Sequence, residues 1–87
     1  MTTARCAGNR HLLDARGMMC PEPIRLAEEK ARSLPDGHYL DVLATDLAAP
    51  IDFEAWCLGR GHQYLGCLEL DEWIRISVQI VAKGAEA

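Results

Sequence analysis

The sequence predicts an α+β domain in which two helices cover one face of a four-stranded mixed sheet, in the order βαβαββ. Three observations predict this class: two segments carry apolar residues at helical spacing, four shorter segments alternate or run apolar, and prolines and glycines separate them. If the strands of each strand-helix-strand unit lie parallel, both crossovers are right-handed and place both helices on the same side. The expected architecture is a two-layer α/β sandwich with one sheet face less covered.

Four segments predict the strands. They cover residues 11–15, 38–44, 63–70 and 73–81, and the last has the clearest alternation. The turn Arg16-Gly17 follows the first segment, and Asp71-Glu72 follows the third. On the less covered face, apolar side chains would favour a partner surface or self-association. The side chains expected there are Leu43, Tyr64, Leu68 and Trp73.

Two segments predict the helices. The first covers residues 21–34, ends at Pro35-Asp36-Gly37, and spaces Glu28 and Arg32 as an i, i+4 ion pair. The second lies within residues 48–58 and stops at Gly59-Arg60-Gly61. The side chains expected to be buried are Ile24, Ala27, Ala31 and Leu34 in the first helix, and Ile51, Phe53, Trp56 and Cys57 in the second.

Composition limits the domain count and the function class. The 87 residues are 49% hydrophobic and 25% charged, which suits one domain and is too little for two. We expect a flexible lead-in at 1–10, the domain at 11–82 and a short tail at 83–87. The net charge of −4 disfavours direct nucleic-acid binding. No segment has the pattern of a signal peptide or a membrane span, so we expect a cytoplasmic protein without a membrane role.

Cys20 stands directly before Pro21 and Pro23, which open the first helix. Proline suits a helix's first turn and pushes the preceding residue to extended geometry, so Cys20 is expected at or next to the N-cap. A lone cysteine is usually a small buried hydrophobe, but a thiol caps a helix poorly, which favours a chemical role.

The charge around Cys20 bears on its reactivity. The positive helix end and the free N–H groups of the first turn, including that of Glu22, predict a lowered pKa for the thiol, supported by Arg16. The Glu22 carboxylate opposes this effect. The resulting thiolate would be a nucleophile for sulfur exchange.

The other cysteines and the histidines show no metal-ligand spacing, and we expect neither a metal nor a cofactor. Cys6 is interpreted as an incidental thiol. Cys57 and Cys67 are expected in the core, with a resolving thiol as the alternative role for Cys67. The three histidines, His11, His38 and His62, are expected at the surface or at sheet edges.

The stretch Leu13-Asp14-Ala15-Arg16-Gly17-Met18-Met19-Cys20-Pro21-Glu22-Pro23 resembles the Leu-Asp-x-x-Gly-x-x-Cys-Pro-x-Pro signature of the TusA/SirA family of small sulfur carriers. The likeness extends from about His11 to Val81 and includes Leu34-x-x-Gly37 and Ala44-Thr45-Asp46. A departure is Leu47, where members often have proline. The family's βαβαββ fold, similar to the C-terminal domain of a bacterial translation initiation factor, agrees with the fold expected here.

The resemblance implies a function. In this family the motif cysteine accepts sulfane sulfur as a persulfide and hands it on, so Cys20 is the expected sulfur-binding residue. Pro21 and Pro23 form the structural part of that site, which Arg16, Gly17 and Glu22 also shape. Thr45 and Asp46 are candidate partner-binding residues.

The resemblance also implies partners. The donor would be a cysteine desulfurase or a rhodanese, and the acceptor another protein of a sulfur relay. The sulfur would serve tRNA thiolation, molybdenum cofactor supply or sulfur oxidation.

Two alternatives stay open. A non-catalytic binding or regulatory module would use the same fold, with Cys20 as a partner contact. Direct RNA binding, suggested by the initiation-factor-like fold, is disfavoured by the acidic charge.

Overall fold

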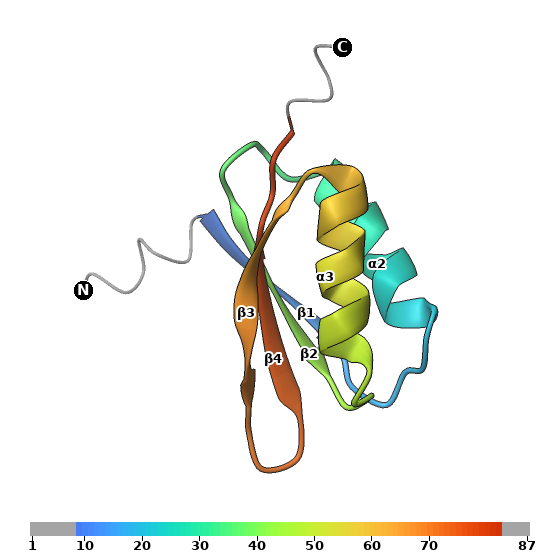
Figure 1. The fold of residues 1–87 in the computed structure, drawn as a ribbon. Coiled ribbons are helices and arrows are strands. Elements are labelled where there is room, and N and C mark those ends of the chain that lie inside the picture. The colour runs from blue at the N-terminus through green and yellow to red at the C-terminus, as the bar shows by residue number, and fades with distance from the viewer. Residues whose placement is uncertain (1–8, 83–87) are drawn as a thin grey trace, which may run out of the picture.

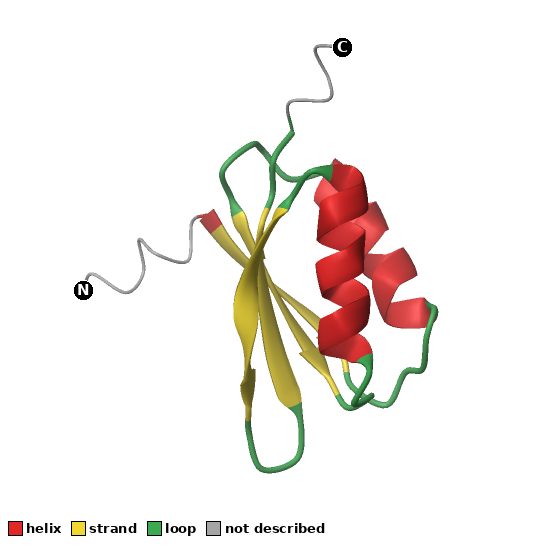
Figure 2. Ribbon diagram, viewed as in Figure 1, coloured by secondary structure: helices red, strands yellow, loops and turns green. Residues whose placement is uncertain are grey.

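The computed structural model describes residues 9–82, which form two layers, a sheet and a pair of helices (Figure 1). The elements are β1 (Arg10–Ala15), α2 (Glu22–Arg32), β2 (Tyr39–Ala44), α3 (Ala49–Arg60), β3 (Gln63–Glu69) and β4 (Ile74–Gln79). Both helices lie on the same side of the sheet (Figure 2), which confirms the predicted class and element order. Cys6, most of the predicted lead-in and the tail at 83–87 lie outside the described residues.

The sheet is mixed, with the strand order β1-β2-β4-β3. β1 and β2 are parallel, with Leu13 opposite Val42, whereas β4 is antiparallel to both β2 and β3. β3 therefore runs in the same direction as β2, and each helix connects two strands of the same direction. Because parallel strands end at one edge, α2 and α3 begin at that edge together.

The core lies between the sheet and the helices. Its strand residues come from alternate positions of β2 and β4, as predicted: Leu40, Val42, Ala44, Ile74, Ile76 and Val78 are all buried. In α3 the buried residues are Ala49, Phe53, Trp56 and Cys57, and Ile51 is 71% exposed. The prediction that Ile51 is buried was therefore wrong, because a period of 3.6 residues turns it away from the stripe formed by the other four.

A bulge in β3 changes which side chains reach the open face of the sheet. The register shifts between Tyr64 and Gly66, so Tyr64 lies opposite Val78 and packs against the core, whereas Leu68 lies opposite Arg75. The extra residue breaks the two-residue alternation, so the prediction that Tyr64 lies on the open face was wrong. The prediction holds for Leu68, which is 59% exposed.

Cys67 is exposed, so the expectation of a core position was also wrong. It lies opposite Ile76, on the helix side of the sheet. Because β3 is an edge strand, Cys67 has a neighbouring strand on one side only and stays accessible to solvent. Cys57 is buried in α3 as expected.

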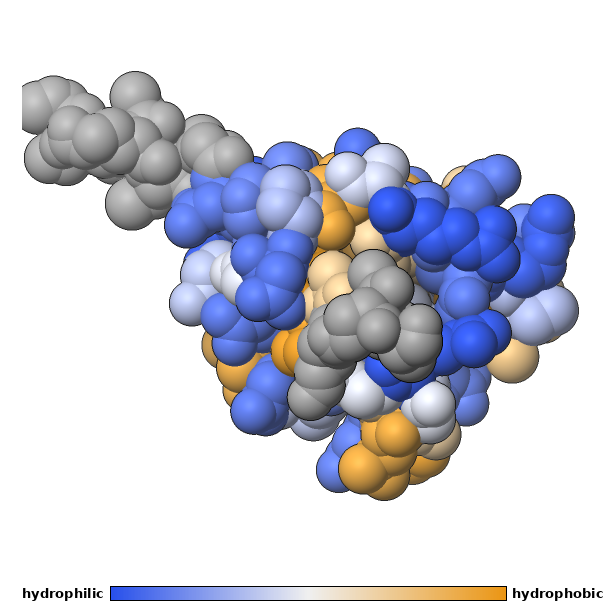
Figure 3. Space-filling view, turned by 90° about the horizontal axis from the view of Figure 1, so that it is seen from above, coloured by the Kyte–Doolittle hydropathy of each residue, from blue (hydrophilic) through white to orange (hydrophobic). Residues whose placement is uncertain are grey.

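Glu28 connects the two helices. Its carboxylate accepts hydrogen bonds from Trp56 Nε1 at 2.7 Å and Arg60 Nε at 3.1 Å. The predicted partner, Arg32, lies 3.9 Å from it. Arg32 is the last residue of α2, and Arg60 is the last residue of α3. Figure 3 views the molecule from the end at which both helices finish, and hydrophilic residues there surround patches of apolar surface. No helix within residues 9–82 has the length and apolar character to cross a membrane.

Candidate functional site

Cys20 lies in the loop between β1 and α2 and is exposed. It directly precedes Pro21, the N-cap of α2, which confirms its predicted position beside the cap. The Cys20–Pro21 peptide bond is cis, and no side chain caps the helix. The thiol is thus presented to solvent at the start of a helix.

The first turn of α2 does not direct all of its N–H groups at the sulfur. The amide of Glu22 donates to the carbonyl of Met19 at 2.9 Å, in a tight turn that includes Cys20. The expectation that this amide is free to point towards the thiol was therefore wrong.

The side chains around Cys20 come from the first turns of both helices. Apolar side chains and two carboxylates surround the thiol, and the hollow that they line with it is too small for a water molecule. These neighbours are Pro23, Ile24, Asp46, Ala49, Asp52 and Phe53. The site therefore joins the two loops that follow the parallel strands β1 and β2.

These neighbours raise the pKa of the Cys20 thiol above its ordinary value. Partial loss of solvent is the largest cause, followed by the charge of the neighbouring Asp52 carboxylate and by the charge of Asp46. The predicted lowering of this pKa was wrong, because partial loss of solvent and the two nearby carboxylates all favour the protonated thiol.

Arg16 and Glu22 direct their charges elsewhere. The Arg16 guanidinium binds the Asp14 carboxylate at 2.9 and 2.8 Å and lies 4.7 Å from the centre of the Trp73 ring. Its hydrogen bond lowers the pKa of Asp14 to about 2. Glu22 is bound by Arg25 at 3.0 Å. The predicted electrostatic effects of Arg16 and Glu22 on Cys20 are therefore replaced by those of Asp52 and Asp46.

Thr45 and Asp46 organise the second loop of the site. The Thr45 hydroxyl accepts a hydrogen bond from the Gly17 amide at 2.8 Å, and Gly17 has a φ of +84° that favours glycine. Asp46 accepts one from the Ala48 amide at 3.0 Å, which holds the turn before α3. The structure thus places Asp46 beside Cys20 and joins the two loops of the site through Gly17 and Thr45.

Asp52 is the site residue that sequence reasoning missed. It lies in the first turn of α3, where acidic residues favour the positive helix end. A signal was available, because two parallel strand-helix units begin their helices at the same sheet edge.

Exposed apolar side chains flank the site in sequence. Met19, Leu47 and Ile51 are 74%, 83% and 71% exposed, and each is the immediate neighbour of Cys20, Asp46 or Asp52. Large exposed apolar groups beside a reactive group are typical of a protein contact surface.

The other described thiols differ from Cys20. Burial raises the pKa of Cys57 to about 11. Burial also raises the pKa of Tyr64 to about 12, with a further contribution from its hydrogen bond to Cys67. Residues 9–82 contain no group of three or more potential metal-binding side chains.

The histidines are half-buried and form local hydrogen bonds. His11 Nε2 and His38 Nδ1 lie 3.0 Å apart, and His62 Nδ1 accepts a hydrogen bond from the Val81 amide at 3.0 Å.

Comparison with known proteins gives a consistent result. The family model described as "Sulfurtransferase TusA" matches residues 11–80. A Neisseria meningitidis protein, provisionally named a sulfur carrier, is 42% identical over 71 residues, which are 82% of this chain and 96% of that protein. The sulfur carrier protein TusA of Pseudomonas syringae pv. syringae is 43% identical over 51 residues, 59% of this chain and 61% of that protein.

Two further matches differ in coverage. A Bacillus subtilis relative is 37% identical over 75 residues, which are 86% of this chain, but the chain spans only 39% of its length. The crystal structure of a SirA-like protein from Desulfitobacterium hafniense matches with a TM-score of 0.69 at 26% identity, covering 82% of this chain and 97% of that one. The two-layer fold is thus shared with a solved protein.

Proposed function

The chain belongs to the TusA sulfurtransferase family, and we propose that it is a sulfur carrier in which Cys20 accepts sulfane sulfur as a persulfide and passes it to another protein. The observation that carries this proposal is the position of Cys20. It is an exposed thiol in the family's motif, in the loop between β1 and α2 and directly before the start of the helix.

The transfer needs a nucleophilic sulfur and no net oxidant. Cys20 sulfur attacks the terminal sulfur of a donor's cysteine persulfide, an S–S bond forms on Cys20, and the donor's S–S bond breaks to release its thiolate. The proton lost by Cys20 ends on the donor thiol. Delivery repeats the exchange in the other direction, with an acceptor thiolate as the attacking group.

Asp52 offers a route for that proton. Partial loss of solvent and then the charge of the Asp52 carboxylate raise the pKa of the Cys20 thiol, so the resting thiol stays protonated. The same carboxylate is placed to take the proton as the sulfur attacks. The carrier would thus be unreactive when free and become nucleophilic beside a persulfide donor.

The partners would dock on the apolar side chains beside the thiol. Met19, Leu47 and Ile51 are exposed and flank the acidic pair Asp46 and Asp52. A donor of complementary chemistry, apolar with basic residues around its persulfide, would fit this surface. We assign the donor role to a cysteine desulfurase or a rhodanese, and the acceptor role to a sulfur-relay protein in the cytoplasm.

Loading with sulfur tests the proposal. The protein is incubated with a cysteine desulfurase and L-cysteine, and its intact mass is measured before and after reduction. The wild type should gain one reducible sulfur atom and Cys20→Ser should gain none, whereas Cys57→Ser should load like the wild type. Equal loading of Cys20→Ser and wild type would contradict the proposal.

The raised pKa of Cys20 favours a second candidate function, a binding module in which this thiol is only a contact. In that case Cys20→Ser would bind a partner as tightly as the wild type, and neither would accept sulfur.

A further inference from the structure

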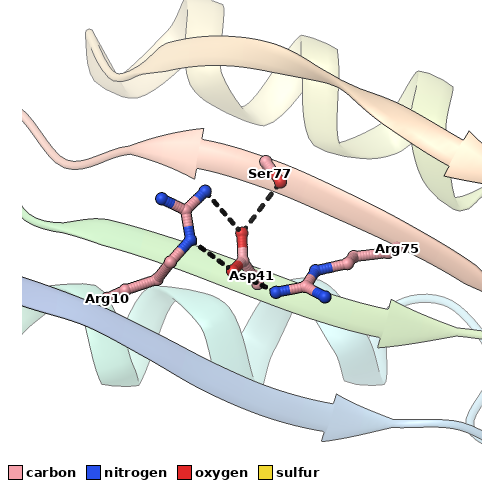
Figure 4. Close-up of polar contacts among 4 residues, drawn as sticks. All are labelled: Arg10, Asp41, Arg75 and Ser77. Carbon is pink, nitrogen blue, oxygen red and sulfur yellow. Dashed lines mark hydrogen bonds and ion pairs between the residues drawn. The ribbon is translucent and has the colours of Figure 1, made fainter. Parts of the chain in front are cut away.

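The open face of the sheet contains a buried carboxylate. Asp41 in β2 is 1% exposed, although it points away from the helices (Figure 4). Its oxygens accept hydrogen bonds from Arg10 Nε, Arg75 Nη2 and Ser77 Oγ, each at 2.8 Å. The donors come from β1 and β4, the strands on either side of β2. Asp41 therefore holds two guanidinium groups over neighbouring strands.

This cluster has more positive than negative charge. Two guanidinium groups share one carboxylate, and within residues 9–82 neither arginine forms an ion pair with another acid. The side chains of Arg10 and Arg75 are 40% and 44% exposed. Each guanidinium has five N–H donors, of which Asp41 engages only some. In a chain of net charge −4, the cluster is a local site for an anionic group.

Two shallow hollows lie on either side of the guanidinium pair, and both are lined by Arg10 and Arg75. The first, of about 360 Å³, has Leu65 and Leu68 of β3 in its wall. The second, of about 500 Å³, has an apolar wall formed by Leu12, Leu43, Leu70 and Trp73. A ligand that spans both hollows must therefore cross the two guanidinium groups.

The apolar walls are open to solvent. Leu12 and Leu68 are each 59% exposed, Leu65 49% and Leu70 42%. Together with a tryptophan and two arginines, which are enriched at binding hot spots, they form a surface suited to a protein partner. A nucleic acid fits less well, because the net charge repels a polyanion and leucines flank the cluster.

We propose that this face binds an acidic segment of a partner protein, with one carboxylate on Arg10 and Arg75 and apolar side chains in the two hollows. Its positive charge complements the carboxylate, and the paired hollows define an extended segment in which acidic and apolar residues alternate. The face lies across the sheet from Phe53 and Ala49, which pack beside Cys20. A partner held there leaves the thiol accessible, so this binding does not depend on the sulfur-carrier role.

A peptide titration of the full-length ¹⁵N-labelled protein tests the proposal. The probe is acetyl-Leu-Glu-Leu-Asp-Leu-amide, and the control is the peptide with lysine at both acidic positions. The acidic peptide should shift amide resonances of β1, β2, β4 and the β3–β4 hairpin, and the lysine peptide should not. Arg75→Gln should weaken binding about tenfold, since a charge-assisted hydrogen bond is lost.

Further variants distinguish a loss of peptide binding from a folding defect. Leu12→Ser changes an exposed wall residue and should also weaken binding, whereas Leu58→Ser on α3 should not. Sulfur loading of Cys20 should be unchanged in Leu12→Ser. The proposal would be overturned by equal binding of both peptides, by shifts confined to the Cys20 loop, or by preferred binding of a uridine oligonucleotide. A dimer that forms through this face and disappears in Leu12→Ser would also overturn it.

Discussion

The amide nitrogen of Gly17 lies 2.8 Å from the hydroxyl oxygen of Thr45. This hydrogen bond joins the loop that carries Cys20 to the loop that carries Asp46. The two loops follow the parallel strands β1 and β2, and this bond links them beyond the last paired residues, Ala15 and Ala44. The acidic environment of the thiol depends on the separation of the two loops.

Thr45→Val removes the hydroxyl that accepts this hydrogen bond. We expect the free energy of unfolding in urea to fall by about 1 kcal/mol, and sulfur loading of Cys20 to slow. Thr45→Ser keeps the hydroxyl and is the matched control. If valine and serine variants had equal stability and equal loading rates, the bond would have no organising role.

Asp52→Asn should lower the pKa of Cys20. The substitution removes the negative charge of Asp52, which favours the protonated form of the Cys20 thiol. The thiolate absorbance can be titrated in a Cys6→Ser, Cys67→Ser background, because burial raises the pKa of the remaining Cys57 to about 11. Glu22→Gln should leave the titration of Cys20 unchanged, because Arg25 binds that carboxylate. A larger shift from Glu22→Gln than from Asp52→Asn would refute the electrostatic account.

Leu47→Ser should slow sulfur loading without lowering stability. Leu47 is 83% exposed in the loop that contains Asp46, so its apolar surface is available to a partner. Losing roughly 1 kcal/mol of apolar contact would reduce the second-order loading rate about fivefold. Leu58→Ser, at an 82% exposed site near the other end of α3, is the control. Equal rates for the two variants would place the docking surface elsewhere.

Asp41→Asn should destabilise the fold. The variant leaves Arg10 and Arg75 beside a neutral amide in place of a buried carboxylate, which should cost about 3 kcal/mol at neutral pH. Urea unfolding measures this cost, and Asp71→Asn in the β3–β4 turn is an exposed control. A loss no larger than that of the control would mean that the cluster contributes no net stability.

The stability difference between the wild type and Asp41→Asn should depend on pH. Burial alone would raise the pKa of Asp41, but hydrogen bonds from Arg75, Arg10 and Ser77 outweigh it and hold the pKa below its usual value. A lowered pKa in the folded state stabilises the fold above the unfolded pKa of about 3.9, and this contribution is lost as the pH falls through the folded value. The stability gap between wild type and Asp41→Asn should therefore narrow below about pH 4. A gap that widens in acid would contradict this assignment.

Local patterns were enough to predict the fold. Alternation in β2 and β4 identified the buried side chains, and the αL residue Gly61 ends α3 within the predicted stop signal. The errors have different causes. The β3 bulge places Tyr64 on the core side of the sheet, and the spacing of its neighbours does not encode that bulge. The exposure of Ile51, by contrast, follows from its position on the helical period relative to the buried residues of α3.

At the candidate site, too, local features were predictable from the sequence, whereas features that depend on packing were not. The proline pair next to Cys20 predicted its place before α2, because that constraint is local. The pKa of Cys20 depends on Asp52 and Asp46, which approach it only when the two parallel units pack together. The burial of Asp41 was not predicted, because it depends on arginines from two other strands.

The most direct test of the central claim is to locate the transferred sulfur among the cysteines. The wild-type protein is loaded with a cysteine desulfurase and L-cysteine, its persulfide is alkylated, and the modified peptide is identified by mass spectrometry. We predict that the added sulfur lies on Cys20, although Cys67 is also exposed. Sulfur found mainly on Cys67, or distributed equally between the two, would contradict the assignment of Cys20 as the carrier residue.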